Sequence, residues 1–427
     1  MSACRAGSVA GLIVLLAGLL VGTHGLVAQV PESGGETVVH GDSDLVERTE
    51  GLLPILSERT GLPVPDTLRV EWSAQEDVDE FLDERLRQDW PGTSAVDRVR
   101  SFHHLGLLPP GTDLIATLRE VHLEQATGFF DFDRGSIHLV RGLPSDIAES
   151  TLVHELVHAL QDAAHPLPSL IGPEVEEDRR AAARAALEAH ATLISVDYMA
   201  GFLPGEGELD LTELGELGAL IRAGIQAMGE ESPALRGAPR FLQEVLLFPY
   251  LDGVEYMEAL WSEVGEVVAP VADRLPPATR DVIHPRPFLA STAPRALPGV
   301  PAVRPGGARD HSGVLGALGT RTFLNFLGWP GGDDLIAGWV GDRFVLDGED
   351  DVVRWLVLWR SEEEEETFRR AVEDRQDSLP GPATVRGAVP VESVEGFGTI
   401  LCVGPPGEEA PSCDPGEHFA LDGEPGR

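Results

Sequence analysis

The sequence of 427 residues contains no lysine, so each of its 32 basic side chains is an arginine, set against 71 aspartates and glutamates. The net charge of −39 makes nucleic acids and anionic membranes poor partners, because such a surface repels other polyanions. We therefore expect no nucleic-acid partner. The charge says nothing about the fold.

Cysteine is also scarce, with one residue near the N-terminus, Cys4, and two near the C-terminus, Cys402 and Cys413. This set does not support a cysteine-based zinc site. Cys4 precedes an apolar run and does not follow it, which disfavours a lipoprotein-type attachment. Cys402 and Cys413 lie close together in a Gly/Pro-rich stretch and can pair in an oxidising compartment. Two free thiols are the alternative.

Long apolar runs are confined to the first thirty residues. Arg5 is followed by an apolar stretch from Val9 to Val21 and then by small and polar residues. This pattern is typical of a secretory signal peptide, and the run is shorter than the roughly 18–20 residues of a spanning helix. The sequence predicts a signal peptide over residues 1–29 and a secreted or periplasmic, extracytoplasmic protein. An uncleaved N-terminal anchor, the one membrane contact we consider, is the alternative.

The rest of the chain alternates between helical and strand periodicity, which indicates an α+β fold. We expect a flexible start over 30–44, a main domain with an N-terminal α/β lobe over 45–284, and a Pro/Gly-rich linker over 285–310. A small C-terminal α+β module over 311–400 and a tail over 401–427 that carries the cysteine pair complete the prediction. The patterns predict helices over 45–60, 75–89, 113–125, 145–163, 176–199, 211–228, 240–248, 253–264, 313–327 and 362–375, and strands over 68–72, 128–133, 136–140, 339–346 and 355–359.

One predicted helix carries the pattern H-E-x-x-H, from His154 to His158. Residues four apart lie on one helix face about 5–6 Å from each other, so both imidazoles can bind one zinc ion. Glu155 would not bind the metal; it would take a proton from the attacking water and pass it to the leaving amine. Apolar neighbours predict a buried helix, in which unpaired histidines are costly. The alternative is an ordinary helix whose histidines only form hydrogen bonds.

A catalytic zinc site needs a third protein ligand. The metzincin spacing fails, because Gln161 and Ala164 occupy the positions seven and ten after His154. Glu188 lies in the middle of the next predicted helix, flanked by alanines that let the two helices approach closely. We predict Glu188 as the third ligand, with a surface glutamate as the alternative.

Peptide hydrolysis also needs a donor that stabilises the oxyanion. Tyr250, one of three tyrosines, and His284 are equal candidates, and packing or surface roles are the alternative for each. Asp162 follows His158 by four residues and either orients an imidazole or faces water.

Several blocks of the chain resemble the gluzincin metallopeptidases, the thermolysin-like group, and in particular a bacterial group of exported members. The blocks are Leu105–Pro110, the hairpin from Gly128, His154–Asp162, Glu188–Ala191, Phe248-Pro249-Tyr250 with Gly253, His284-Pro285, and Gly338-Trp339 with Gly341-Asp342-Arg343. The likeness spans most of the chain after the predicted signal peptide. It implies a catalytic domain with a small sheet, an edge hairpin and a two-helix zinc site on His154, His158 and Glu188.

The motif and the resemblance together predict an exported zinc-dependent metallopeptidase acting on peptide or protein substrates, with Glu155 as the base. The alternative is an exported zinc-binding or structural protein that keeps the helix pair and cleaves nothing.

Overall fold

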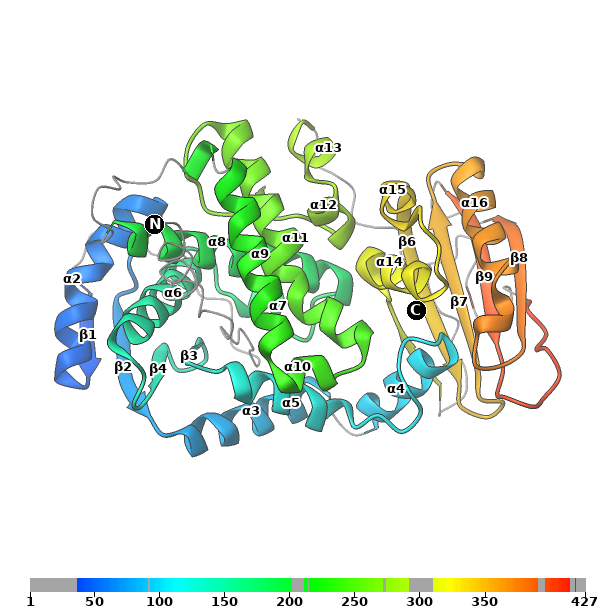
Figure 1. Cartoon of the computed structure of the whole chain (residues 1–427), viewed down its shortest axis with the longest axis horizontal. Helices are drawn as coiled ribbons and strands as arrows, with labels where there is room; N and C mark the ends of the chain where they lie inside the picture. Colours follow the sequence, from blue (N-terminus) through cyan, green and yellow to red (C-terminus); the bar gives the residue numbers. More distant parts are fainter. Residues whose placement is uncertain are drawn as a thin grey trace, which may run out of the picture.

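The computed structural model describes residues 37–90, 93–201, 211–213, 215–271, 274–291, 310–390, 396–414 and 419. The predicted signal peptide lies outside these ranges, as do residues 292–309 of the predicted linker. The described chain is a mixed α+β structure, as expected, with a sheet at each end and helices between them (Figure 1). No helix within the described ranges combines the length and the apolar composition that crossing a bilayer requires.

The first sheet has four strands in the spatial order β1 (Val38–Gly41), β2 (Thr67–Ser73), β4 (Ser136–Val140) and β3 (Gly128–Asp131). Strands β1, β2 and β4 run parallel, whereas β3 is an edge strand antiparallel to β4. The predicted hairpin is thus present, with a shorter first strand than expected. It leads through a short turn into the helix that carries the motif.

The start of the chain differs from the prediction of a flexible segment over 30–44. Residues 38–41 form β1, and the helix begins at Ser43. The cause is pairing with a distant segment, because β1 aligns with β2 from Val38 opposite Thr67 to Gly41 opposite Val70. Four residues are too few to show a strand period in the sequence.

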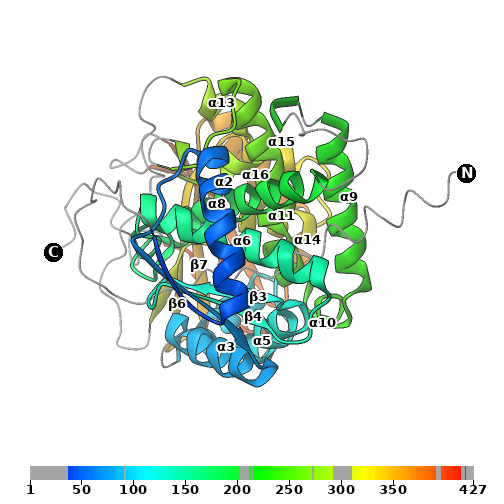
Figure 2. The ribbon, with the colours of Figure 1, turned by 90° about the vertical axis from the view of Figure 1, so that its left-hand side faces the viewer.

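Helices lie between the two sheets and around the first one (Figure 1). They are α2 (Ser43–Thr60), α3 (Gln75–Asp89), α4 (Ser94–His104), α5 (Leu114–Gln125), α6 (Ser145–Ala164), α7 (Pro168–Ile171), α8 (Glu177–Ala200), the 3₁₀ turn η1 (Leu211–Glu213), α9 (Gly215–Glu231), α10 (Pro233–Gly237), α11 (Arg240–Val264), α12 (Thr279–Ile283) and α13 (Pro285–Leu289). Helix α13 occupies the first residues of the predicted linker. In the view from the side of the first sheet, α2 crosses in front of α6, against which it packs (Figure 2).

Helix α11 is one helix where the sequence predicts two, over 240–248 and 253–264. It passes through both Pro249 and Gly253. Gly253 lies where α11 meets α8, and a Cβ there would come within 2.5 Å of the carbonyl oxygen of Ala185. The glycine therefore serves close helix contact and does not end the helix.

The second sheet is antiparallel, with the strand order β5 (His311–Gly313), β6 (Trp339–Asp347), β7 (Val352–Trp359), β9 (Phe397–Val403) and β8 (Ala383–Pro390). Helices α14 (Gly316–Phe326), α15 (Gly332–Ile336) and α16 (Glu362–Glu373) and the 3₁₀ turn η3 (Gln376–Ser378) accompany it. Side chains of β7 alternate between two apolar clusters, with Trp355 and Trp359 in one and Leu356 and Leu358 in the other. Central strand β7 is therefore covered on both faces.

Cys402 and Cys413 form a disulfide, which confirms the predicted pairing and excludes the free thiols. Cys402 belongs to β9, so the predicted boundary at residue 400 cuts through a strand. The disulfide ties the segment after β9 to the face of the sheet that also holds Phe419.

Candidate metal centre

Three buried side chains from α6 and α8 converge on one point. The Nε2 atoms of His154 and His158 lie 3.0 Å apart, and Oε2 of Glu188 lies 3.4 Å from the first and 3.7 Å from the second. A tetrahedral ion with bonds of about 2.0–2.2 Å places its ligand atoms about 3.3–3.6 Å from each other. The predicted trio is thus brought together, and this buried group could hold a metal ion.

The local sequence explains this convergence. Helix α6 is buried on almost every side from Ser150 to Gln161, so its two histidines stay in the interior. Ala185 and Ala189 of α8 are fully buried beside Glu188 and keep that helix close to its neighbours. Helix α8 has the strong helix propensity of an alanine-rich segment.

The electrostatics of the group favour a cation. Burial raises the pKa of Glu188, but the charges and hydrogen bonds of both imidazoles outweigh burial and hold that pKa at about 2. Burial lowers the pKa of His158, but Glu188 with Glu155 and Gln161 outweighs it, so the pKa is raised. Burial outweighs the effect of Glu188 at His154, whose pKa is lowered, so that imidazole stays neutral. A carboxylate that favours positive charge on one imidazole, beside a second imidazole that is neutral, attracts metal ions for the same reason.

Gln161 fixes the orientation of the second histidine. Its Oε1 lies 2.8 Å from Nδ1 of His158, while its Nε2 donates to the Leu187 carbonyl at 3.1 Å. Nδ1 of His158 therefore carries the proton, and the lone pair on Nε2 points at the converging ligand atoms. The sequence reasoning missed this role, although Gln161 lies one turn after His158 on the same helix.

Two polar atoms next to the group have no hydrogen-bond partner in the described part of the chain. They are Nδ1 of His154 and Oε2 of Glu155, both in side chains that are 1% exposed. The Nε2 atoms of the two histidines and the Glu188 carboxylate converge beside them, so the donor set fits a metal ion with a reactive group at its side. Burial and the nearby Glu188 raise the pKa of Glu155 to about 8, against a lowering effect of His158 and of a hydrogen bond with the Phe130 backbone.

Of the two predicted oxyanion donors, the structure places one at the centre. Tyr250 on α11 is buried, and its hydroxyl donates to Oε2 of Glu188 at 3.3 Å. Burial and Glu188 raise the pKa of Tyr250 well above its usual value, so the hydroxyl keeps its proton. His284, between α12 and α13, instead has its Nε2 2.8 Å from the carbonyl oxygen of Asp333 on α15. Asp162, in the last turn of α6, accepts a hydrogen bond from the Leu167 backbone at 2.8 Å, so its carboxylate binds the segment that follows the helix.

Comparisons with protein-family models, with curated proteins and with solved structures gave no match. The centre is therefore interpreted from its own geometry.

A cavity of about 260 Å³ reaches the centre from one side, where Glu188 and Tyr250 are part of its wall. Helices α3, α5, α8 and α11 supply most of the lining. The wall is largely apolar, and its other polar members are Asp89, His122, Gln125, Glu177, Arg180 and Arg184. The sequence reasoning named none of these as site residues, because their meeting depends on how α3 and α5 pack against α8.

The edge strand β3 lies against the motif helix α6. Because the N–H of Val140 donates to the Thr127 carbonyl, the alternation of the ladder leaves the backbone groups of Gly128 and Phe130 facing away from β4. The Phe130 backbone forms a hydrogen bond with Glu155. The edge strand of the sheet and the candidate base are therefore adjacent.

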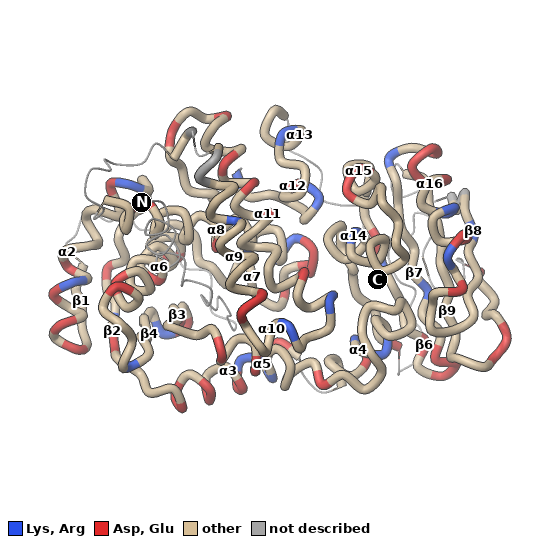
Figure 3. Tube along the Cα trace, viewed as in Figure 1, with Lys and Arg blue, Asp and Glu red and all other residues tan. Residues whose placement is uncertain are grey.

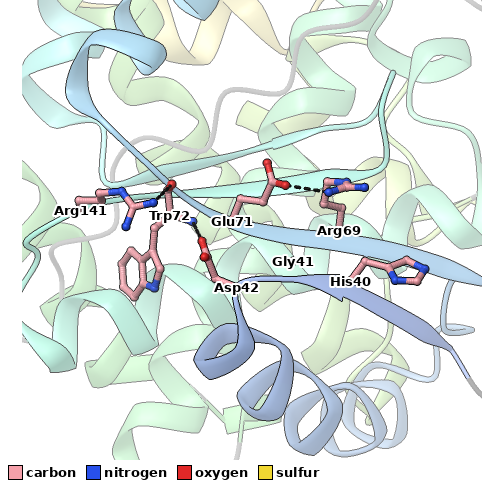
Figure 4. Close-up of a pocket in the computed structure, with 7 residues that line it drawn as sticks. All are labelled: His40, Gly41, Asp42, Arg69, Glu71, Trp72 and Arg141. Atoms are coloured by element: carbon pink, nitrogen blue, oxygen red, sulfur yellow. Dashed lines mark hydrogen bonds and ion pairs between the residues drawn. The ribbon is translucent and has the colours of Figure 1, made fainter.

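A second hollow lies beside β1 and β2 and is lined by polar side chains that bind one another (Figure 4). Arg69 pairs with Glu71 at 2.8 Å, and Asp42 accepts the backbone N–H of Trp72 at 2.8 Å. Arg141 donates to the Trp72 carbonyl at 2.9 Å. These mutual contacts give the hollow a structural role, and it holds none of the three metal-group residues.

Proposed function

We propose that this protein is an exported zinc-dependent metallopeptidase with His154, His158 and Glu188 as ligands and Glu155 as general base. The observation that carries the proposal is the convergence of the three ligand atoms at 3.0–3.7 Å beside Oε2 of Glu155, which has no hydrogen-bond partner among the described residues. Two imidazoles and one carboxylate are a ligand set that zinc prefers in hydrolytic sites.

A bound zinc ion would polarise the scissile carbonyl and lower the pKa of a water molecule. Glu155 accepts the proton of the attacking water at Oε2 as the water oxygen bonds to the carbonyl carbon. It then delivers this proton to the amide nitrogen, the C–N bond breaks, and a carboxylic acid and an amine form. The acid passes its proton to the amine, so that a carboxylate and an ammonium group leave. The Tyr250 hydroxyl, held over the centre, donates to the oxygen on which negative charge develops.

The position of the edge strand β3 beside Glu155 supports a peptide substrate in particular. An extended peptide can add to an exposed sheet edge through main-chain hydrogen bonds. The adjacent position of Phe130 and Glu155 would bring the backbone of such a peptide to the base. A substrate without a peptide backbone would gain nothing from this edge.

The disulfide between Cys402 and Cys413 supports the exported location, because disulfides persist in oxidising compartments. If the first 29 residues are a signal peptide, the intact mass of the protein recovered from the extracytoplasmic fraction will lack them. A full-length mass in the membrane fraction would favour the uncleaved anchor instead.

The decisive experiment is Glu155→Gln in the zinc-loaded protein, assayed on a broad peptide library. We expect zinc to stay bound at one ion per chain, because Glu155 is not a ligand, and kcat to fall about 10²- to 10⁴-fold. Glu149→Gln, on the same helix and paired with Tyr198 and Arg48, is the matched control.

Full turnover by Glu155→Gln with bound zinc would contradict the proposed mechanism. A wild-type protein that binds zinc at one ion per chain and cleaves no peptide in the library would favour the alternative, a zinc-binding protein without catalysis. A zinc site without catalysis would also have its three ligands deeply buried, so burial alone does not distinguish the two functions.

A further inference from the structure

One face of helix α5 forms part of the wall of the cavity beside Glu188. The α5 residues in this wall follow helical spacing and are Leu118, Val121, His122 and Gln125. The first two are apolar, whereas the last two lie in the final turn of the helix and carry hydrogen-bonding groups. Largely apolar pockets with a few converging polar groups are typical of ligand sites.

The charged side chains of the wall balance one another. Glu188 belongs to the metal group. The other charged residues in the wall are two carboxylates and two arginines, Asp89, Glu177, Arg180 and Arg184. The charge of Asp89 favours the ionised form of both arginines. The wall therefore offers no surplus of charge of either sign, which favours an uncharged ligand group.

The two polar residues of α5 are uncharged and available. Neither His122 nor Gln125 forms a side-chain hydrogen bond with any residue in the described part of the chain. Burial and the nearby Arg184 lower the pKa of His122 to about 4, against the opposite effect of Glu188. Its imidazole is therefore neutral at pH 7, with one N–H donor and one acceptor nitrogen. Because Gln125 follows three residues later, its amide adds a second donor and acceptor on the same helix face.

An amide group is the chemical complement of this pair. It carries a donor and an acceptor on different atoms, so it can bind both side chains at once. A hydroxyl group has both functions on one atom, and a carboxylate has no donor. A peptide presents amides in its main chain and in the side chains of asparagine and glutamine.

We infer that this cavity binds an uncharged amide group of the substrate near the cleaved bond, through His122 and Gln125. The amide belongs either to an asparagine or glutamine side chain or to the main chain of the peptide. The apolar part of the wall holds the methylene groups or the side chain next to it. This inference rests on the proposed peptidase function and adds a substrate class to it.

The first test compares matched peptides with the zinc-loaded wild-type protein. Short alanine peptides carry glutamine, glutamate or methionine at one position at a time, and methionine matches glutamine in length without its amide. If a side chain is bound, kcat/KM at one position should be about 10- to 100-fold higher for glutamine than for the other two, because the wall would otherwise keep unpaired polar groups.

If the main chain is bound, the three peptides should be cleaved equally. Replacing one main-chain amide by an ester should then lower kcat/KM by about the same factor, because the ester lacks the N–H donor. A preference for glutamate, or no effect of either change, would overturn the inference.

Variants assign the preference to the two residues. Gln125→Met keeps the length of the side chain and should remove the preference for the amide. His122→Asn keeps a donor and an acceptor and should retain part of it, whereas His122→Phe should not. Gln88→Met, at an exposed position of α3 outside this wall, is the matched control and should keep the full preference. A preference that survives both Gln125→Met and His122→Phe would overturn the assignment.

A binding measurement separates this inference from the proposed function. Zinc-loaded Glu155→Gln is titrated with the same peptides by calorimetry, where no turnover is needed. Tighter binding of a glutamine peptide, or weaker binding of an ester peptide, with no cleavage by the wild-type protein overturns the peptidase and supports the amide site. Cleavage by the wild-type protein without either effect overturns the amide site and leaves the peptidase standing. Because the wild-type comparison needs no variant, the inference stays testable even if a variant does not fold.

Discussion

At the residue scale, the side-chain amide of Gln161 connects the motif helix to α8. Its Nε2 donates to the Leu187 carbonyl and lies 3.0 Å from Nδ1 of His190, so its oxygen has to face His158. A carbonyl can only accept, and this fixes which way the amide points. The orientation of the His158 imidazole therefore depends on where α8 lies, through the two hydrogen bonds of Gln161.

Replacing Gln161 by leucine should weaken zinc binding about 10- to 100-fold, because His158 loses the acceptor that fixes its tautomer and ring orientation. Competition with a chromogenic chelator measures the dissociation constant. Gln88→Leu on α3, an exposed position, is the control and should bind zinc as the wild type does. An unchanged constant for Gln161→Leu would mean that the helix alone orients His158.

The oxyanion donor can be assigned with a pair of variants. Tyr250→Phe removes only the hydroxyl that lies 3.3 Å from Glu188, and we expect kcat to fall about 10²- to 10³-fold. His284→Gln should leave kcat unchanged, because that side chain is bound to the Asp333 carbonyl. If Tyr250→Phe weakens zinc binding and leaves kcat of the loaded protein intact, the hydroxyl only positions Glu188. A loss of kcat in His284→Gln alone would reverse the assignment.

At the element scale, the crossing of α8 and α11 sets the position of both Glu188 and Tyr250. Gly253 makes the crossing close, with the carbonyl oxygen of Ala185 and the Cβ of Ala189 on the other side. Small residues on both helices let the backbones approach, so a change at Gly253 acts on the metal centre from a distance.

Gly253→Ala should lower the free energy of unfolding by about 1–3 kcal/mol and weaken zinc binding, because the added methyl group meets the α8 backbone. Gly51→Ala is a matched control inside α2, where nothing lies within 4 Å of the added Cβ. That control should gain about 0.5–1 kcal/mol from helix propensity. Urea unfolding measures both. An equal increase in the free energy of unfolding for both variants would show that a methyl group fits between α8 and α11 without strain.

Long periodic elements were predictable from the sequence, and short or non-local ones were not. The helices that carry His154 and Glu188 have strong periodicity or strong intrinsic propensity, so the predicted ranges differ from the structure by only a residue or two. Strand β1 exists only through pairing with β2, and α11 continues through Pro249 because α8 packs against it. Helix α4 and strand β8 were also missed. Tertiary contacts determine whether such elements form, and the local sequence pattern does not indicate those contacts.

The same division applies to the site. The three converging side chains could be predicted from the sequence, because the motif gives His154 and His158 and the next predicted helix contains Glu188. The role of Glu155 as a base stays a prediction. The cavity wall could not be predicted, since His122 comes from α5 and Arg184 from α8, and only the packing of these helices brings them together.

At the scale of the whole molecule, acidic residues spread over the outer elements, including α2, α3 and α16 (Figure 3). Arginines are fewer, and several bind carboxylates across elements, as Arg321 of α14 does with Asp252 of α11 at 2.6 Å. Such pairs join the helical centre to the C-terminal sheet. Most surface pairs contribute little, so the buried contacts of this junction matter more.

Two buried carboxylates hold the N-terminus of α14 between the helical centre and the second sheet. Asp178 of α8 accepts hydrogen bonds from Thr279 and from the Ala317 backbone at 3.2 Å. Asp342 of β6 accepts the backbone N–H groups of Leu315 and Gly316 at 2.9 and 2.8 Å. The orphan N–H groups of the helix start are satisfied from two sides, so both parts of the molecule depend on one small cluster.

This cluster should make stability depend on pH. Burial raises the pKa of Asp342 to about 6, against the lowering effect of its hydrogen bonds, which include one from Trp355. Between about pH 4 and pH 6 the unfolded chain has lost this proton and the folded chain still holds it, so unfolding releases a proton and stability falls as pH rises. The contribution is complete below pH 4 and lost above pH 6. It amounts to about 2–3 kcal/mol.

Urea unfolding of the wild type and of Asp342→Asn at pH 4 and pH 7 tests this directly. The variant should be less stable than the wild type at pH 4, because an amide cannot accept all three N–H groups. Its free energy of unfolding relative to the wild type should rise by about 2–3 kcal/mol from pH 4 to pH 7, because only the wild type loses the contribution of the Asp342 proton. The difference between the two proteins cancels the titration of the acids that do not interact with Asp342; Asp178, whose pKa Asp342 helps to raise, is the exception. A shift in the opposite direction would mean that the three N–H donors outweigh burial and keep Asp342 ionised. The free energy of unfolding would then fall as the pH falls, and not as it rises.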